Sequence, residues 1–285
     1  GRESAAGRPQ VRDAARQPVW TRALGLAAAA CLLLVGIAVL AGQVLAQARA
    51  DWAEPVNVSR SGAASEPTLL ALPGGTLRVL WWDQFEGLTV ADGPLPAAAG
   101  GTSGEEPAAA AGDGAWSDPV RAPILMVQPG QEVTTPTPID VMPRILGDAE
   151  GRAQAFWLGQ PDEETGAVPL HYSRLVPGRL SWSVPLTLSV AAGAFDAAAD
   201  PSGTLHLAYV QPAQVGRSPS GLYHRRSRDG GASWSAATIV QQSLYLRLLP
   251  VDGDALRLTA HSAVSLTVAW QDPRRAEVVV ARSTD

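Results

Sequence analysis

Histidines and clustered carboxylates are the residues of this sequence that could hold a metal ion, because imidazole nitrogens and carboxylate oxygens are common ligands. The histidines lack the H-E-x-x-H spacing of a zinc site, and two of them recur at equivalent repeat positions, which favours structural roles. The acidic run 162–164 would bind Ca²⁺ only if further oxygen ligands converged on it. The sequence therefore predicts no metal site and no cofactor. The histidines are His171, His206, His224 and His261, of which His171 and His224 are the repeat equivalents.

Residues 227–234, "SRDGGASW", combine polar groups and glycines in a way that suits either a ligand loop or a self-sealed turn. The glycines reach the positive φ that hairpin loops demand. Ser227 and Asp229 can bond the backbone amides of the loop itself. Trp234 adds a large apolar surface at the start of the next strand. We predict a hairpin loop pinned by an indole, with a structural rather than a chemical role.

The elements that position these residues recur along the chain after residue 50. Four segments begin with a Trp that is followed by a small or acidic residue and then by a step like Pro-Val. Alternating runs that end in aromatic residues lie between these segments. Each unit of roughly 50–65 residues holds about four short strands, and no helical period of useful length is present. This pattern predicts an all-β fold, a β-propeller of four-stranded blades, with about three complete blades and part of a fourth in residues 51–285. The four tryptophans are Trp52, Trp116, Trp182 and Trp234.

Two further features concern the limits of this pattern. Residues 93–114 are rich in Gly, Pro and Ala, and we predict a disordered insertion there. Strands that lead to a Ser-containing turn also recur, and the last of them reaches Ser283 and Asp285, which match Ser227 and Asp229. We therefore expect the sequence to be a fragment of a longer protein, incomplete at its C-terminus.

The first fifty residues predict a route out of the cytoplasm. Residues 23–48 contain no charged side chain, and this uncharged segment is long enough for a transmembrane helix. The Arg-rich segment 1–22 precedes it, and the positive-inside rule places that segment in the cytoplasm. The prediction is a single-pass signal anchor in the cell membrane, with the following domain outside the cytoplasm. A cleaved signal peptide, with cleavage near Ala50 and a secreted product, is the alternative.

Charge and cysteine content exclude some classes of partner. Residues 51–285 carry 16 arginines against 25 acidic residues, and phosphate backbones require a basic surface, so we predict no nucleic-acid partner. The single cysteine, Cys31, lies in the apolar segment and allows no disulfide within one chain. The domain must therefore be held by its apolar core.

The pattern Ser227-x-Asp229-x-Gly231-x-x-Trp234 resembles the Asp-box, or bacterial neuraminidase repeat (BNR), of the sialidase-like superfamily. The match is complete here and half-present at Ser283 and Asp285. The resemblance implies a propeller in which such loops lie on the outer hairpin of a blade, away from the ligand face.

An active sialidase would require three arginines that grip a carboxylate, a Tyr nucleophile paired with a Glu, and an Asp acid/base. The nearest match to the family's first arginine step is "MPRIL", which makes Arg144 the candidate ligand-binding residue, with a strand-edge arginine as the alternative. Three of the tyrosines recur across the repeats, which favours packing roles for them. The tyrosines are Tyr172, Tyr209, Tyr223 and the unrepeated Tyr245.

Three functions are compatible with this sequence. The first is a membrane-anchored propeller that binds a glycan or a protein as a scaffold, which the missing catalytic signature favours. The second is a sialidase-type glycoside hydrolase. The third is a cell-envelope assembly factor without a carbohydrate ligand. The sequence favours a binding module over an enzyme, and it assigns no catalytic residues.

Overall fold

The computed structural model describes residues 37, 55–95, 116–127, 136–176, 179–212, 218–250 and 255–283. The predicted cytoplasmic tail at 1–22 lies outside these residues, and within 23–48 only Ile37 is described, in helical conformation. No helix among the described residues is both long enough and apolar enough to cross a bilayer. The chain divides into two compact units, 1–57 and 58–285, and all the strands belong to the second.

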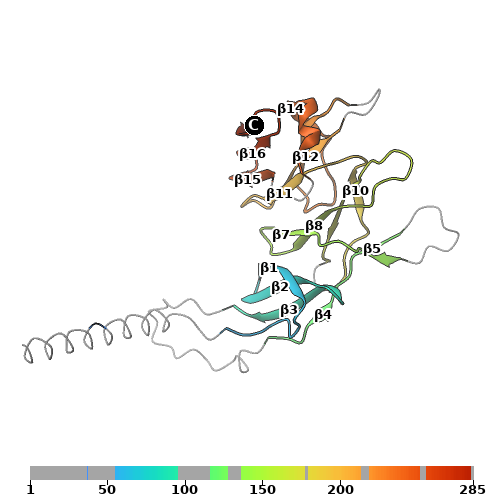
Figure 1. The fold of residues 1–285 in the computed structure, drawn as a ribbon. Helices are drawn as coiled ribbons and strands as arrows, with labels where there is room; N and C mark the ends of the chain where they lie inside the picture. The colour runs from blue at the N-terminus through green and yellow to red at the C-terminus, as the bar shows by residue number, and fades with distance from the viewer. Residues whose placement is uncertain are drawn as a thin grey trace, which may run out of the picture. The chain divides into compact units, whose positions relative to one another are not determined.

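The second unit is all-β, as predicted, and its strands form consecutive antiparallel sheets in chain order (Figure 1). The first sheet contains β1 (Ala64–Leu72), β2 (Thr76–Asp83), β3 (Gly87–Pro94) and β4 (Val120–Arg121). The second contains β7 (Arg144–Gly147), β8 (Ala153–Leu158), β9 (Leu170–Arg174) and β10 (Leu186–Ser189). The third contains β11 (Phe195–Ala199), β12 (Leu205–Gln211), β13 (Gly221–Ser227) and β14 (Thr238–Gln242). The fourth contains β15 (Leu256–Ala260), β16 (Leu266–Asp272) and β17 (Glu277–Ser283).

Two short elements complete the unit: a separate pair of strands, β5 (Leu125–Met126) and β6 (Thr137–Pro138), and the 3₁₀-helix η1 (Leu244–Leu248). One predicted boundary is wrong. The insertion was expected to begin at Gly93, but Gly93 and Pro94 pair with β2 as the end of β3. The backbone pairing extends the strand through these two residues although their side chains offer little to bury. Residues 96–114 of the predicted insertion lie outside the described part of the chain.

The hairpins that open the second, third and fourth sheets share one register. Their innermost pairs are Gly147↔Ala153, Ala199↔Leu205 and Ala260↔Leu266, each with a separation of six residues. Because register fixes which side chains share a face, positions counted from these pairs are equivalent between sheets. The third-sheet turn is closed by Asp200, whose carboxylate accepts the amide of Thr204 at 2.9 Å, with Gly203 at positive φ.

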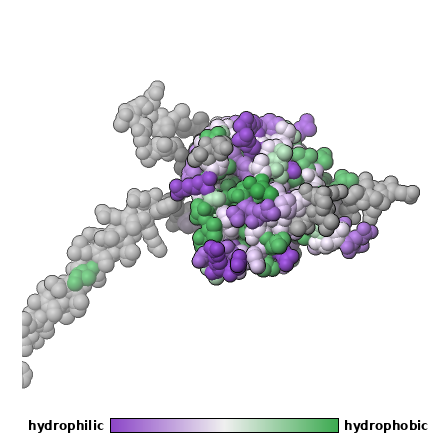
Figure 2. Space-filling model, turned by 90° about the horizontal axis from the view of Figure 1, so that it is seen from above, coloured by the Kyte–Doolittle hydropathy of each residue, from purple (hydrophilic) through white to green (hydrophobic). Residues whose placement is uncertain are grey.

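The core consists of three clusters, each of which joins two consecutive sheets. Leu80 and Val90 of the first sheet cluster with Ala155 of the second. Phe156 and Tyr172 of the second sheet cluster with residues of β12, and further β12 residues cluster with β15 and β16. Every residue of β12 is buried, because this strand contacts a cluster on each face. On the face seen in Figure 2, polar and apolar residues are interspersed.

Candidate functional site

The Asp-box loop bonds mostly to itself. Ser227 Oγ donates to Asp229 Oδ1 at 2.8 Å and accepts the amide of Gly231 at 2.8 Å. Asp229 also accepts the amide of Ser233 at 2.9 Å and its hydroxyl at 2.5 Å. These bonds satisfy the loop's own donors, so the polar groups that looked available in the sequence already have partners. Of the second, partial box, Ser283 is the last residue of β17 and Asp285 lies outside the described residues.

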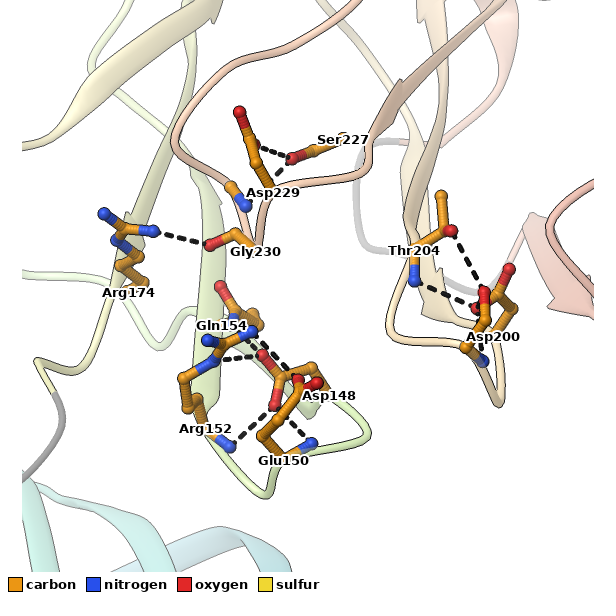
Figure 3. A network of polar contacts seen from close by, with 12 residues as sticks. Asp148, Glu150, Arg152, Gln154, Arg174, Asp200, Thr204, Ser227, Asp229 and Gly230 are labelled. Atoms are coloured by element: carbon orange, nitrogen blue, oxygen red, sulfur yellow. Dashed lines mark hydrogen bonds and ion pairs between the residues drawn. The ribbon is translucent and has the colours of Figure 1, made fainter.

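The loop also packs on the preceding sheet. The Gly230 carbonyl accepts Arg174 Nη1 at 2.9 Å (Figure 3). It also accepts Tyr172 Oη at 3.3 Å. Trp234 lies edge-on against Phe156 and Tyr172, with ring centroids 5.8 and 5.3 Å apart. Aromatic pairs of this geometry add to the apolar area that they bury. The loop therefore connects the third sheet to the second.

Acid is expected to loosen this loop. Hydrogen bonds from Ser233, first through its hydroxyl and then through its amide, lower the pKa of Asp229 to about 2. A depressed carboxylate pKa stabilises the folded state above the ordinary value of about 4 and ceases to do so as pH falls through the folded value. The melting temperature should therefore drop between about pH 4 and pH 2. Asp229→Asn should show a smaller drop over that window in thermal melts, and an unchanged drop would contradict this assignment.

Arg144 begins β7 and faces a buried carboxylate. Its Nε lies 2.5 Å from Asp196 Oδ1 of β11, and its side chain remains 45% exposed while that of Asp196 is 1% exposed. Asp196 Oδ2 also accepts the backbone amide of Leu258, on β15, at 2.7 Å. Burial raises the pKa of Asp196, whereas the Leu258 amide and the charges of Arg144 and Arg257 lower it. One carboxylate therefore joins the first strands of three sheets.

Arg144, Asp196 and Arg257 occupy equivalent positions, three residues before the innermost pair of each hairpin. Arg144 is ion-paired with Asp196, and the charge of Arg257 also acts on that carboxylate. While Asp196 is ionised, these three side chains together carry one net positive charge. Guanidinium groups bind carboxylate and sulfate oxygens in a planar, bidentate geometry. The cluster Arg144–Asp196–Arg257, called here the arginine pair, can bind an anionic group. The sequence analysis did not identify Asp196 or Arg257, although counting from the turns of the repeats would have aligned both with Arg144.

The model of the BNR repeat-like domain matches residues 151–284, a little less than half of the chain. The predicted resemblance to the BNR-repeat superfamily is confirmed. No curated protein matches the chain. The match contains the complete Asp-box and the arginine at 257.

Solved structures to which the chain is similar include a PL25 ulvan lyase bound to -[GlcA(1-4)Rha3S]-. The two chains are 16% identical, with a TM-score of 0.43, and the match covers 76% of this chain and 49% of the lyase. The leech intramolecular trans-sialidase, complexed with 2,7-anhydro-Neu5Ac, has 12% identity and a TM-score of 0.44 over 82% of this chain and 52% of its own. A protein of unknown function from Dyadobacter fermentans has 15% identity and a TM-score of 0.42 over 81% and 69%. The chain spans about half the length of the lyase and of the trans-sialidase.

The tyrosines between residues 151 and 284 are held by partners other than glutamate. Tyr172 Oη donates to Gln154 Oε1 at 2.5 Å, and burial raises its pKa. Tyr209 stacks on Tyr223, whose hydroxyl donates to the Pro219 carbonyl at 2.7 Å. Tyr245, which is 46% exposed, lies under the guanidinium of an arginine on the β16–β17 turn. Among the described residues, no hydrogen bond joins a tyrosine to a glutamate.

Two buried polar chains run through the second and third sheets. In the second, Asp148 accepts Gln154 Nε2 at 2.8 Å (Figure 3). Gln154 Oε1 in turn accepts the hydroxyl of Tyr172. In the third, the equivalent residues are Asp200, His206 and His224: Asp200 Oδ2 lies 3.6 Å from His206 Nε2, and His206 Nδ1 lies 3.2 Å from His224 Nε2. The predicted equivalence of His171 and His224 is wrong by one residue, because the strand pairing aligns His224 with Tyr172.

Both histidines of this third-sheet chain are held in the neutral form. Burial is the main cause that lowers the pKa of His206. Burial is also the main cause that lowers the pKa of His224, to about 4; repulsion from His206 whenever that ring is protonated, and then the charge of Arg226, add to it.

The remaining candidates for metal binding have local partners. Asp162 closes its own loop, with Oδ1 accepting the amide and hydroxyl of Thr165 at 2.8 and 2.7 Å. His171 lies against Trp157 in the second sheet, with ring centroids 5.5 Å apart, and His261 lies 3.3 Å from the Thr267 hydroxyl. In the part of the chain that the structure describes, no cluster of three or more His, Cys, Asp or Glu side chains is arranged to hold a metal ion.

Proposed function

We propose that residues 51–285 form a propeller-type domain, with the sheets as blades, which binds an anionic glycan through the arginine pair. The single observation that supports the binding role is that Arg144 pairs with the buried Asp196 carboxylate, on which the charge of Arg257 also acts. We further propose that residues 23–48 hold this domain outside the cytoplasm at the cell membrane. A uronate, sialate or sulfate group of the glycan would balance the net positive charge of the two arginines and Asp196.

The charge balance of the cluster favours an anion over a neutral sugar. Asp196 pairs with Nε of Arg144. The Arg144 side chain is 45% exposed, so part of its guanidinium group is accessible to a ligand. An anion that binds there faces two cations and one carboxylate that is already engaged with a backbone amide. Hydrogen bonds to charged groups each contribute about 1.5–3 kcal/mol, so one bidentate contact is enough for selectivity between a charged and an uncharged sugar.

Binding is favoured over hydrolysis because of the tyrosines. A sialidase-type mechanism requires a Tyr nucleophile activated by a Glu. The four tyrosines have a glutamine, a second ring, a backbone carbonyl and an arginine as partners instead. Hydrolysis and a role in envelope assembly without a carbohydrate ligand are therefore outcomes of the test and not the proposal.

We expect the full chain to bind sialyllactose more tightly than lactose, because the two differ by one carboxylate-bearing sugar. Arg144→Ala should weaken sialyllactose binding by about tenfold or more, and Arg144→Lys by less, because Lys keeps the charge and loses the bidentate geometry. Isothermal titration at low and high salt measures both effects. Arg275→Ala, which removes an exposed arginine on the β16–β17 turn, is the matched control.

Equal affinity for the two sugars, or the same affinity in Arg144→Ala as in Arg275→Ala, would reject the proposed anion site. Thermal melts of each variant separate a lost contact from a lost fold. Turnover of a fluorogenic sialoside by the same preparations would establish the hydrolase alternative. Absence of sugar binding together with a crosslinked protein partner would support the envelope-assembly alternative.

A further inference from the structure

A cavity of about 410 Å³ lies between the second and third sheets. Residues 187–190, at the end of β10, line it from the second sheet, and residues mainly of β12 and β13 line it from the third. Val190 is 58% exposed, so the cavity reaches the surface of the domain. Ligand pockets measure about 300–1,000 Å³, and a cavity at the small end of that range suits a ligand the size of a sugar ring. None of its lining residues belongs to the arginine pair.

Arg225, on β13, lines this cavity without a counter-ion. Its Nε is buried and has no hydrogen-bond acceptor. Among the described residues, no aspartate or glutamate forms an ion pair with it. A buried charge is costly unless a group of opposite sign compensates it, and a guanidinium group does not give up its proton. The described part of the fold therefore supplies no anion for Arg225.

The repeats indicate that Arg225 does not belong to the common packing of the sheets. It lies opposite Leu207, which is two residues beyond the innermost pair of its hairpin. The matching positions of the second and fourth sheets hold Ser173 and Ala281. A residue that the packing of each unit required would recur at this position. Among these three sheets, arginine occurs there once, next to the cavity.

The groups around Arg225 suit the hydroxyl groups of a sugar. Burial raises the pKa of Tyr209, and the charge of Arg225 is the first of the causes that oppose this rise, so the two side chains lie close together. The Ser218 hydroxyl accepts Gln211 Nε2, which leaves its own hydrogen free to donate. Thr187 contributes another hydroxyl from the second sheet. The cavity therefore combines one cation with several neutral hydrogen-bonding groups.

We propose that this cavity is a second anion site, which binds a carboxylate carried on a hydroxylated ring, as in a uronic acid. The carboxylate pairs with the guanidinium of Arg225, because its two oxygens match the planar fork of N–H donors. The ring hydroxyls bond to the polar groups of the lining. This site shares no residue with the arginine pair, so it is correct or incorrect independently of the proposed function.

The test is isothermal titration of the full chain carrying Arg144→Ala, which removes the main contact of the arginine pair. We expect D-glucuronate to bind at least tenfold more tightly than D-glucose, because the two rings differ by one carboxylate. Adding Arg225→Met should abolish this difference, and Arg225→Lys should weaken glucuronate binding severalfold. Arg275→Met, which replaces an exposed arginine, is the matched control and should leave the affinity unchanged.

A uronic acid can be free or can stand at the end of a glycan, and methyl β-D-glucuronide separates these two sources. Binding as tight as that of glucuronate would assign the site to the terminal unit of a glycan. Loss of binding on methylation would assign it to the free acid. The carboxylate and the pairing with Arg225 are the same in both cases.

The cost of an unpaired charge provides a second measurement. Arg225→Met keeps much of the length of the side chain and removes the charge, so without sugar it should melt at a temperature no lower than that of the unsubstituted protein. A structural arginine would behave in the opposite way. A melting temperature below that of Arg275→Met, or failure of Arg225→Met to fold, would reject the proposal by showing that the fold itself supplies a partner for this charge.

Equal affinity for glucuronate and glucose in the Arg144→Ala protein would overturn the proposal. Equal glucuronate affinity with Arg225→Met and with Arg275→Met would also overturn it. These failures are distinct from failure of the proposed function. Glucuronate binding that requires Arg144 but not Arg225 would leave the arginine pair as the anion site, whereas binding that requires Arg225 but not Arg144 would support the cavity and reject the arginine pair.

Discussion

Gly231→Ala is expected to lower the free energy of unfolding by about 3 kcal/mol. Gly231 has φ +83°, a conformation that favours glycine, and a Cβ there would overlap the hydroxyl of Tyr172. Tyr172 cannot retreat easily, because it is buried and bonded to Gln154. Urea denaturation of the full chain measures the change in free energy.

Gly166→Ala is the matched control for this prediction. Gly166 also has positive φ, +66°, but a Cβ there meets nothing within 4 Å. It should therefore cost about 1 kcal/mol, the backbone contribution alone. If the two substitutions destabilised the protein equally, the close approach of the Asp-box loop to the second sheet would be disproved.

Asp148→Ala is the second substitution with a large expected effect, a loss of about 3 kcal/mol. The Asp148 side chain is fully buried, and its carboxylate accepts the amide of Arg152 at 2.8 Å and Nε of Arg152 at 2.6 Å. It also accepts Gln154 Nε2, and Gln154 has no exposed surface. Removal of the carboxylate leaves a buried amide and a partly buried guanidinium without their acceptor, which costs more than the bond itself contributes.

Asp162→Ala provides the comparison, because Asp162 closes an exposed turn with similar backbone bonds. We expect it to cost about 1 kcal/mol, since water replaces the lost partners of an exposed turn. Asp148→Asn should fall between the two, because its amide keeps the shape but one of its two acceptor oxygens becomes a donor. Equal losses for Asp148→Ala and Asp162→Ala in urea denaturation would show that burial of this network does not matter.

Local patterns were enough to predict the strands and the Asp-box loop. Alternating apolar residues specify strands because successive side chains point to opposite faces. The loop is equally local: Ser227, Asp229 and Ser233 bond within seven residues of chain, so their types and spacing determine its conformation.

Contacts between sheets could not be read from such patterns. Arg144, Asp196 and the amide of Leu258 are far apart in sequence and meet because β7, β11 and β15 lie next to one another. Tyr172 was expected to pack, but its hydroxyl also joins Gln154 to Gly230. The extent of β3 through Pro94 depended on its partner strand in the same way.

The sequence by itself determined the all-β class, the repeated unit and the self-bonded loop at 227–234, because each depends on side-chain periodicity or on bonds between near neighbours. Only the tertiary structure decided which charged and polar groups meet: the arginine pair around Asp196, the histidine pair of the third sheet and the position of Trp234 on the preceding sheet. The physical reason is that these contacts depend on how one sheet packs on the next, and that packing is set by the complete core rather than by any short segment.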